Sequence, residues 1–276
     1  MIKILLTGAN GFVGRNIYNN LKNKYQIDIP SRSELDLTLP ESVSRYLHKK
    51  TYNWVIHCAI KGGKRNIKDS KDVLSANLIM FNNIINNKSQ FNNLINFTSG
   101  AELDRRYNID LTNNDVINSK PIDYYGLSKN IISRKLLNYP NYYNLRVYGL
   151  FGVDEGENRF FSTAIKSIHE NKSIEIFEDK YFDYFYILDL VTILEKIISS
   201  KTKNIPHSLD IVYKEKLLLS DIAKILIKKL NGRSEIIIKN NILGNSYIGK
   251  YSDAIKDLDL IGLDKGISQM INSFKY

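Results

Sequence analysis

Two side chains that normally keep their protons far above neutral pH stand four positions apart in the stretch YYGLSK, residues 124–129. They are Tyr125 and Lys129, and on a helix the positions i and i+4 lie on one face. A nearby ammonium favours the phenolate, so Lys129 is expected to lower the pKa of Tyr125 from about 10 toward the working pH. Tyr125 could then exchange a proton with an alcohol or a ketone.

A hydroxyl that polarises the same oxygen is expected at the C-terminal end of a neighbouring strand, where ligands gather in open α/β sheets. The run NLINFT (93–98) predicts such a strand, and it continues into FTSGAEL (97–103). We select Ser99 for this role, with Thr98 as the alternative and a simple capping hydroxyl as the non-functional interpretation. Ser99, Tyr125 and Lys129 together predict chemistry on a carbonyl or its alcohol.

A glycine-rich turn precedes these residues in the chain. TGANGFVG (7–14) places Gly8, Gly11 and Gly14 at intervals of three between an apolar run, IKILLT, and a segment with helical apolar spacing. Glycines at the first strand-to-helix turn let the backbone approach a pyrophosphate, and the helix N-terminus offers free N–H groups. The turn predicts a dinucleotide site, and a tight turn without a ligand is the other interpretation.

The elements that must position these groups alternate along the chain. Apolar runs predict strands near 2–7, 25–29, 53–58, 93–98 and 142–147, and helical spacing predicts helices near 11–24, 40–49, 70–87 and 122–138. Alternating strands and helices with apolar strands predict an α/β fold, a Rossmann-type doubly wound parallel sheet.

The regular alternation of strands and helices ends after about residue 150. We expect a helix near 159–170, a strand near 173–177, the aromatic stretch YFDYFYILDL (181–190) and a helix to about 199. The predicted division is a dinucleotide-binding domain of residues 1–158 plus about 181–200, and a small α/β substrate lobe of about 159–180 and 201–276. The sequence contains no Pro/Gly/Ser-rich linker, so the lobe is expected to pack tightly on the first unit.

The choice between NADP(H) and NAD(H) depends on IDIPSRSELDL (27–37). Pro30 is expected to end the second strand and leave Arg32 beside the ribose, where a basic group pairs with a 2′-phosphate. NADP(H) is therefore favoured. If the strand ends earlier, Asp28 could bind a 2′-hydroxyl, and NAD(H) would bind instead.

Composition narrows the remaining possibilities. The 276 residues carry a net charge of +10, but Lys and Arg are spread along the chain without a basic block, so we expect anionic small molecules rather than nucleic acid as ligands. One cysteine and four scattered histidines provide no metal-ligand spacing. No run reaches the roughly 18 apolar residues of a membrane span, and the early Gly and Asn predict no signal peptide, so we expect a soluble, cytoplasmic protein.

These stretches together resemble the extended short-chain dehydrogenase/reductase superfamily, in its NAD(P)-dependent epimerase/dehydratase group that acts on nucleotide sugars. The resemblance runs over most of the chain and includes HCAIKGG (57–63), ANLIMFNNI (76–84) and NLRVYGLFG (144–152). SRSELDL and AIKGG look most like GDP-fucose synthase and its sugar 4-reductase relatives. The resemblance implies a homodimer built on a helical bundle that includes the Tyr125 helix, and a lobe that binds a nucleotide sugar.

Departures from the family pattern exclude some activities. GDP-fucose synthase has a cysteine two residues after its serine and a histidine before the first lobe helix, which match Ala101 and Arg159 here. Alanine cannot move a proton, so epimerisation beside the ketone is not expected. The acid and base of sugar dehydratases would fall on Gly100 and Ala101, which excludes dehydration. Gly149 replaces an asparagine that the family often has before its final Tyr-Gly, and Phe182 replaces a family arginine that contacts the nucleotide.

The expected contacts follow from the motifs and the resemblance. Lys129 also contacts the nicotinamide ribose, and the other cofactor residues are Gly8, Asn10, Gly11, Phe12, Val13, Gly14, Arg32, Asp36, Leu37 and Ala59. Lys61, Tyr148 and Arg159 are the candidate substrate residues, with Arg65 and Phe151 as weaker ones. His57 and Cys58 are expected to pack beneath the cofactor, and Asn77 to brace the site.

The activity that fits this pattern is NADPH-dependent reduction of the C4 ketone of a nucleotide-activated 4-keto sugar, of deoxy or heptose type, for bacterial surface polysaccharide. Two alternatives stay open. A 4-epimerase or C4 dehydrogenase with tightly bound NAD would use the same three residues, and a non-catalytic dinucleotide sensor would need none of them.

Overall fold

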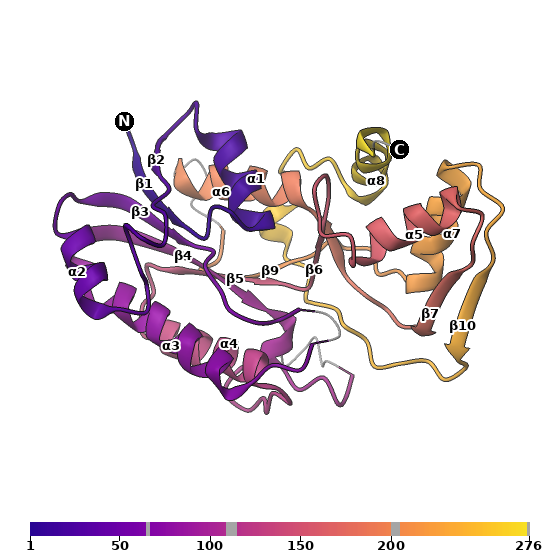
Figure 1. Cartoon of the computed structure of the whole chain (residues 1–276), viewed down its shortest axis with the longest axis horizontal. Coiled ribbons are helices and arrows are strands. Elements are labelled where there is room, and N and C mark those ends of the chain that lie inside the picture. The colour runs from indigo at the N-terminus through magenta and orange to yellow at the C-terminus, as the bar shows by residue number, and fades with distance from the viewer. Residues whose placement is uncertain (65–66, 109–114, 200–204, 275–276) are drawn as a thin grey trace.

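The structure is a computed structural model that describes residues 1–64, 67–108, 115–199 and 205–274. Figure 1 shows a large α/β unit at the left and a smaller lobe at the right. Arg65, one of the weaker substrate candidates, lies outside the described residues.

A six-stranded sheet forms the centre of the large unit, and every neighbouring pair in it is parallel. In spatial order its strands are β2 (Gln26–Asp28), β1 (Lys3–Thr7), β3 (Tyr52–His57), β4 (Phe91–Ser99), β5 (Tyr143–Val147) and β9 (Ser208–Ile211). The chain runs outward from β1 to β2 and then returns to the other side at β3. The predicted doubly wound parallel sheet is confirmed, and its strand order reverses between β1 and β3, which is where such sheets bind ligands.

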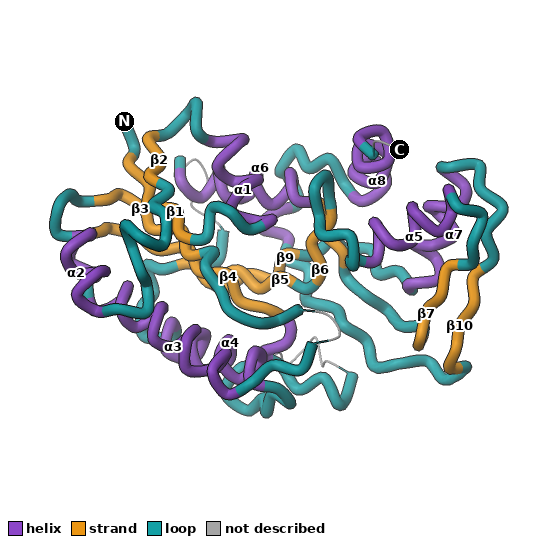
Figure 2. Tube along the Cα trace, in the orientation of Figure 1, coloured by secondary structure: helices purple, strands orange, loops and turns teal. Residues whose placement is uncertain are grey.

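Helices cover both faces of this sheet. One face carries α1 (Phe12–Leu21) and α6 (Ile187–Ile198), and the other carries α2 (Pro40–Leu47), α3 (Lys71–Asn86) and α4 (Tyr124–Leu136), as Figures 1 and 2 show. Leu5 and Leu6 on β1 belong to different core clusters, because successive strand residues point to opposite faces. The sheet is therefore buried on both sides, as its nearly continuous apolar strands require.

The smaller lobe contains a second, two-stranded parallel sheet of β7 (Ile174–Glu178) and β10 (Ile236–Asn240), beside the helices α5 (Phe160–His169) and α7 (Leu219–Lys229). A short parallel pair, β6 (Gly149–Phe151) and β8 (Tyr184–Tyr186), joins the two units. The remaining elements are α8 (Leu263–Ser273) and the 3₁₀ turns η1 (Lys88–Gln90), η2 (Gly100–Glu102) and η3 (Asp253–Ile255).

The predicted division needs one correction. The sequence predicts residues 208–211 in the lobe with the rest of 201–276, but they form β9 and pair with β5 at the edge of the main sheet. A four-residue strand of sequence SLDI carries no sign of the sheet that it joins, because pairing is decided by tertiary contacts. The helices described here contain no segment long and apolar enough to cross a membrane.

Candidate active site

Ser99 is the last residue of β4, at the carboxyl edge of the sheet. Its Oγ accepts a hydrogen bond from the Ala101 backbone N–H at 3.2 Å and lies 3.1 Å from the hydroxyl of Tyr247 in the lobe. The alternative hydroxyl, on Thr98, is buried and donates to the carboxylate of Glu102. Of the two candidates, Ser99 is therefore the one next to the other predicted residues.

Helix α4 brings Tyr125 and Lys129 to this strand end. Its N-cap is Asp123, whose carboxylate accepts from the Gly126 backbone N–H at 2.7 Å and pairs with Arg105. Gly126 allows the helix to approach closely, because a Cβ there would lie 2.2 Å from the carbonyl oxygen of Ala101. The cap and the glycine together fix the first turn of α4 against η2.

Tyr125 and Ser99 interact through their hydroxyls, and this hydrogen bond favours the phenolate. Burial is the larger effect, however, and it raises the pKa of Tyr125 above its ordinary value, with the nearby Tyr247 acting in the same direction. The prediction that Lys129 brings the pKa of Tyr125 toward neutrality is therefore not met. Tyr125 is a phenol that keeps its proton, which suits it to donate one.

Lys129 lies beneath the site with its ammonium in the protein interior. Its Nζ donates to the Phe97 carbonyl at 2.6 Å and lies 5.9 Å from the centre of the Tyr125 ring. Burial lowers the pKa of Lys129 to about 8, although the carboxylate of Glu102 opposes this shift. Its proton is thus easier to lose than that of a surface lysine.

The glycine turn lies where the strand order reverses. Gly8 has φ +71°, and a Cβ on it would lie 2.5 Å from the Ala59 backbone nitrogen, while a Cβ on Gly14 would lie 2.3 Å from the Gly8 carbonyl oxygen. Gly11 is the N-cap of α1, so the first backbone N–H groups of that helix receive no side-chain cap. The turn thus offers uncapped N–H donors, and its glycines have no side chains to keep a ligand away from the backbone. Both features fit a dinucleotide pyrophosphate.

Packing accounts for His57 and Cys58, as predicted. The Nδ1 atom of His57 lies 2.9 Å from the Thr7 hydroxyl, and burial lowers the pKa of this histidine to about 3. Burial also raises the pKa of the Cys58 thiol. Both side chains are uncharged at neutral pH, so they line the floor of the turn without adding charge.

The two candidates for ribose recognition differ in accessibility. Arg32 is 81% exposed, and its Nε donates to Asp36 at 3.2 Å. Asp28 accepts from the Tyr52 hydroxyl at 2.7 Å and pairs with Lys50. Asp36 is held by the Thr38 backbone N–H and hydroxyl, which keep its pKa low. Arg32 is available to a ligand, whereas the carboxylate of Asp28 already has partners.

The other predicted cofactor residues surround the same turn. Phe12 and Val13 form the first turn of α1 and pack partly on the core, and the Asn10 carbonyl accepts from Arg15 at 3.2 Å. Leu37 is buried in the cluster under α2 and α3, and the Ala59 backbone N–H donates to the Thr7 hydroxyl at 3.4 Å. Residues 10–13 thus lie in the glycine turn and the start of α1, Ala59 lies two residues past β3, and Leu37 lies in the segment between β2 and α2.

The loop after β3 packs over Tyr125. A Cβ on Gly63, where φ is +71°, would lie 2.7 Å from Cε2 of that ring. Asn77 of α3 holds this loop as predicted, because it bonds both the N–H and the carbonyl of Lys61, at 2.9 and 3.0 Å, and donates to Ser128 at 3.1 Å. The Lys61 side chain is exposed at the rim.

On the lobe side, the two residues that depart from the family pattern, Gly149 and Phe182, lie next to each other. A Cβ on Gly149 would lie 2.7 Å from the Tyr184 ring and 2.8 Å from the Phe182 ring. Those rings stack with centroids 4.6 Å apart, and Phe182 also contacts Tyr247 at 5.0 Å. Gly149 and Phe182 are therefore coupled, since the small residue makes room for the ring.

The remaining substrate candidates lie at different depths. Tyr148 is buried, with its hydroxyl 3.2 Å from Asp210 and its ring against Tyr247, so it forms a wall behind the site. Phe151 is fully buried and stacks on Phe161, which makes it a core residue. Arg159 is the exposed N-cap of α5, and its charge partly opposes the rise in the pKa of Tyr125 that burial causes.

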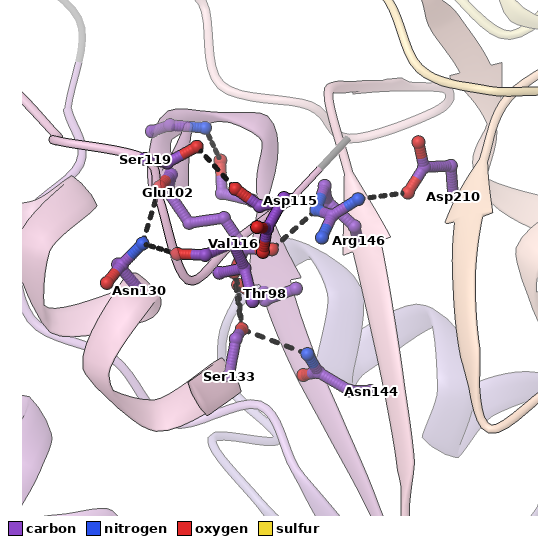
Figure 3. Close-up of polar contacts among 12 residues, drawn as sticks. Thr98, Glu102, Asp115, Val116, Ser119, Asn130, Ser133, Asn144, Arg146 and Asp210 are labelled. Carbon is purple, nitrogen blue, oxygen red and sulfur yellow. Dashed lines mark hydrogen bonds and ion pairs between the residues drawn. The ribbon is translucent and has the colours of Figure 1, made fainter. Parts of the chain in front are cut away.

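A buried charged network supports the strand ends, as Figure 3 shows. Glu102 is 0% exposed and accepts from Thr98, Ser133 and the Arg146 guanidinium. Arg146 also pairs with Asp210 at 2.6 Å, and Asp210 accepts from the Lys250 backbone N–H at 2.8 Å. The network therefore links β4, η2, α4, β5 and β9 to the loop that precedes η3.

Sequence reasoning missed Glu102, Arg146, Asp210 and Tyr247. Arg146 carried a usable signal, because it lies inside an apolar strand segment, where a charged residue is almost never buried without a partner. Tyr247 carried none, since it lies in an irregular loop that pairs with Tyr181 and Asp183 through its backbone. Among the described residues, no three His, Cys, Asp or Glu side chains gather so that they could hold a metal ion.

Comparisons with known proteins agree with this geometry. Residues 4–211 match the model of the NAD dependent epimerase/dehydratase family. GDP-L-colitose synthase of Yersinia pseudotuberculosis is 26% identical, covering 99% of this chain and 98% of its own. GDP-L-fucose synthase of Azorhizobium caulinodans is 26% identical over 76% of this chain and 74% of its own. The NADP-bound GDP-mannoheptose C4 reductase of Campylobacter jejuni superposes with a TM-score of 0.82 at 17% identity, over 98% and 97% of the two chains, a likeness of fold.

Proposed function

This chain belongs to the NAD dependent epimerase/dehydratase family, and on that premise we propose that it reduces the C4 ketone of a nucleotide-activated 4-keto sugar with NADPH. The sugar is of the deoxy or heptose type. One observation carries the proposal: Ser99, Tyr125 and Lys129 converge at the end of β4, while the neighbouring Gly100 and Ala101 carry no group that moves a proton. Hydride transfer fits this set, and the names of the relatives fit the substrate class.

The chain's own residues supply the rest of the chemistry. The nicotinamide provides the hydride when it is bound. Ser99 donates a hydrogen bond to the C4 oxygen, which stabilises the charge that develops there. Tyr125, whose raised pKa keeps it protonated, gives its proton to that oxygen as the alcohol forms. Lys129 would bind the ribose hydroxyls of the cofactor, and its side chain lies buried next to the Phe97 carbonyl.

NADP(H) is favoured over NAD(H) by the contacts of two side chains. Arg32 presents an exposed guanidinium just past β2, where a ribose 2′-phosphate would lie. Asp28 is the residue that would otherwise bind a 2′-hydroxyl, but its carboxylate accepts a hydrogen bond from Tyr52 and pairs with Lys50. The pyrophosphate would lie on the uncapped N-terminus of α1.

Substrate binding is assigned to three residues from the surroundings of the site. Arg159 lies close enough to act on Tyr125 and can pair with the diphosphate as a bidentate donor. Lys61 stands on the exposed rim and adds charge for the same group. Tyr148 shapes the sugar pocket indirectly, by supporting the ring of Tyr247 at 5.1 Å.

A homodimer is part of the proposal. Helices α3 and α4 expose the apolar side chains of Ile79 and Ile131 on the face of the large unit away from the sheet. Such a face is suited to pair with a second copy in a helical bundle. Light scattering should give twice the chain mass of 31.8 kDa.

The product would be an activated deoxy sugar or heptose for a bacterial surface polysaccharide, such as a capsule or an O-antigen. An epimerase or C4 dehydrogenase with retained NAD is the alternative, because Ser99, Tyr125 and Lys129 would serve it equally. A dinucleotide sensor without turnover is the second alternative, and it leaves the three converging side chains unexplained.

The test begins with the protein purified without added cofactor. Denaturation and chromatography of any released nucleotide should find the protein empty, and NADPH should then bind well above NADH. Arg32→Ala should reduce that preference by about tenfold, the value of one favourable charge contact of roughly 1.4 kcal/mol, while Arg45→Ala, at an exposed arginine of α2, should not change it. Stoichiometric bound NAD would contradict the proposal and favour the epimerase or dehydrogenase.

A further inference from the structure

Tyr247 reaches the catalytic strand end from the lobe. Its Oη lies 3.1 Å from Ser99 Oγ, and a Cβ on Gly100 would lie 3.0 Å from its ring. The backbone is fixed on both sides, because the Tyr247 N–H donates to the Tyr181 carbonyl at 2.8 Å and the Asp183 N–H donates to the Tyr247 carbonyl at 3.0 Å. The hydroxyl is therefore placed by the fold of the lobe and not by a free loop.

Ring contacts fix the remaining freedom of this side chain. The Tyr148 ring meets it edge to face at 5.1 Å, and the Phe182 ring lies tilted at 5.0 Å. Asp183, which is buried, holds the following turn by accepting from the Gly249 N–H at 2.7 Å and pairing with Lys216 at 2.6 Å. Two rings and an ion pair thus hold one hydroxyl against Ser99.

The number of hydrogen bonds that Ser99 can make determines what the Tyr247 hydroxyl can do to it. A serine hydroxyl has one proton to donate and two lone pairs that accept. The Ala101 N–H takes one lone pair, at 3.2 Å. If Tyr247 donates to the second, both lone pairs are occupied, and the serine proton is left for the side of the site where the Tyr125 hydroxyl lies and where the substrate oxygen would bind.

We propose that Tyr247 is a positioning residue that donates its hydroxyl proton to Ser99 and so directs the Ser99 proton at the C4 oxygen of the substrate. The inference rests on the proposed function. Burial raises the pKa of Tyr247, so its phenol keeps the proton that this role requires. Because the residue belongs to the lobe, the carbonyl-binding group of the sheet is complete only when the lobe is docked on it.

The kinetic test compares Tyr247→Phe with wild type, using NADPH and GDP-4-keto-6-deoxy-D-mannose as the probe. Loss of the donor should lower kcat by roughly tenfold to 100-fold and change the KM for the sugar much less, since the contact acts on the transition state. Tyr181→Phe, a neighbouring and exposed lobe tyrosine, should keep the wild-type kcat. Adding Tyr247→Phe to Ser99→Ala should cause no further loss.

Equal kcat for Tyr247→Phe and wild type, or a full additional loss on top of Ser99→Ala, would overturn the proposal. A second measurement needs no substrate. The thermal midpoints of wild type, both single variants and the double variant should be non-additive, because the two hydroxyls share one bond. Strictly additive midpoints would refute the contact. If wild type fails on GDP- and dTDP-linked 4-keto sugars while the midpoints stay non-additive, the proposed function is refuted and the contact stands.

Discussion

The sheet and the lobe hold their sides of the candidate site by different forces. On the sheet side, the side chains around β4 are fixed by hydrogen bonds and buried ion pairs that run from Glu102 through Arg146 to Asp210. On the lobe side, the rings of Phe182 and Tyr184 stack, and the ring of Tyr247 packs at a tilt against Phe182. Charged hydrogen bonds are directional, whereas ring packing tolerates small shifts. The sheet side is thus suited to placing reacting atoms, and the lobe side mainly to shaping a pocket, with the hydroxyl of Tyr247 as the polar group that it adds beside Ser99.

The two sides should also differ in the stability that a substitution costs. Breaking a buried ion pair leaves an uncompensated charge in the interior. Trimming a stacked ring leaves a gap, and neighbouring rings can partly fill it. We therefore expect substitutions on the sheet side to have the larger effects on turnover and stability.

The largest effect is expected at Tyr125. Tyr125→Phe removes the proton donor without changing the ring, and kcat for 4-keto-sugar reduction should fall by about 10²-fold to 10⁴-fold. The neighbouring Tyr124 is exposed, so Tyr124→Phe is the matched control and should leave kcat unchanged. Initial rates of NADPH oxidation measure both. Wild-type turnover by Tyr125→Phe would remove the chemical basis of the contrast.

The next effect is on stability, at the network under the sheet. Glu102→Ala leaves the buried Arg146 with Asp210 alone, and the free energy of unfolding should fall by about 3–5 kcal/mol. Glu170→Ala, which breaks an exposed pair with Lys172, should lose less than about 1 kcal/mol. Urea denaturation compares the two. Similar losses for both variants would show that burial does not distinguish the network.

A smaller effect concerns pH. Burial lowers the pKa of Lys129 to about 8 from an ordinary 10.5, so the ammonium is present below about pH 8 and is lost as the pH rises through that value. Tyr125, with its raised pKa, stays protonated over the same range. The value of kcat/KM for NADPH, which reports the free enzyme, should therefore decline above about pH 8.

The control for this assignment is Lys129→Met, which should remove the alkaline decline because the titrating group is gone. An alkaline limb that persists in the variant would assign the decline to another group. A wild-type profile that stays flat to pH 10 would mean that the charge on Lys129 plays no part in cofactor binding.

The contrast also explains how far the sequence could predict the site. The glycine turn, the strand end at Ser99 and the Tyr125–Lys129 spacing are local patterns, and the structure brings them together because parallel strands share one carboxyl edge. The apolar runs likewise predicted five strands of the main sheet. The place of β9 in the main sheet could not be predicted, because the sequence of a four-residue strand does not indicate which strand it pairs with.

The remainder depends on contacts between segments far apart in the chain. Ser99 and Tyr247 are 148 positions apart, and Arg146 and Asp210 are 64 apart. The pKa of Tyr125 was predicted in the wrong direction for the same reason, since spacing to Lys129 is visible in the sequence and burial is not. The sequence shows that Gly149 and Phe182 each depart from the family pattern, but it does not show that the two residues are in contact.

The most direct test of the central claim follows the hydride itself. The protein is incubated with NADPH deuterated at both C4 positions of the nicotinamide and with GDP-4-keto-6-deoxy-D-mannose, and the sugar product is analysed by mass spectrometry and NMR. We predict one deuterium, located at C4 of the sugar, and no exchange at C3 or C5 when the reaction is run in D₂O. A product without deuterium at C4, or with solvent deuterium beside it, would contradict reduction by this site.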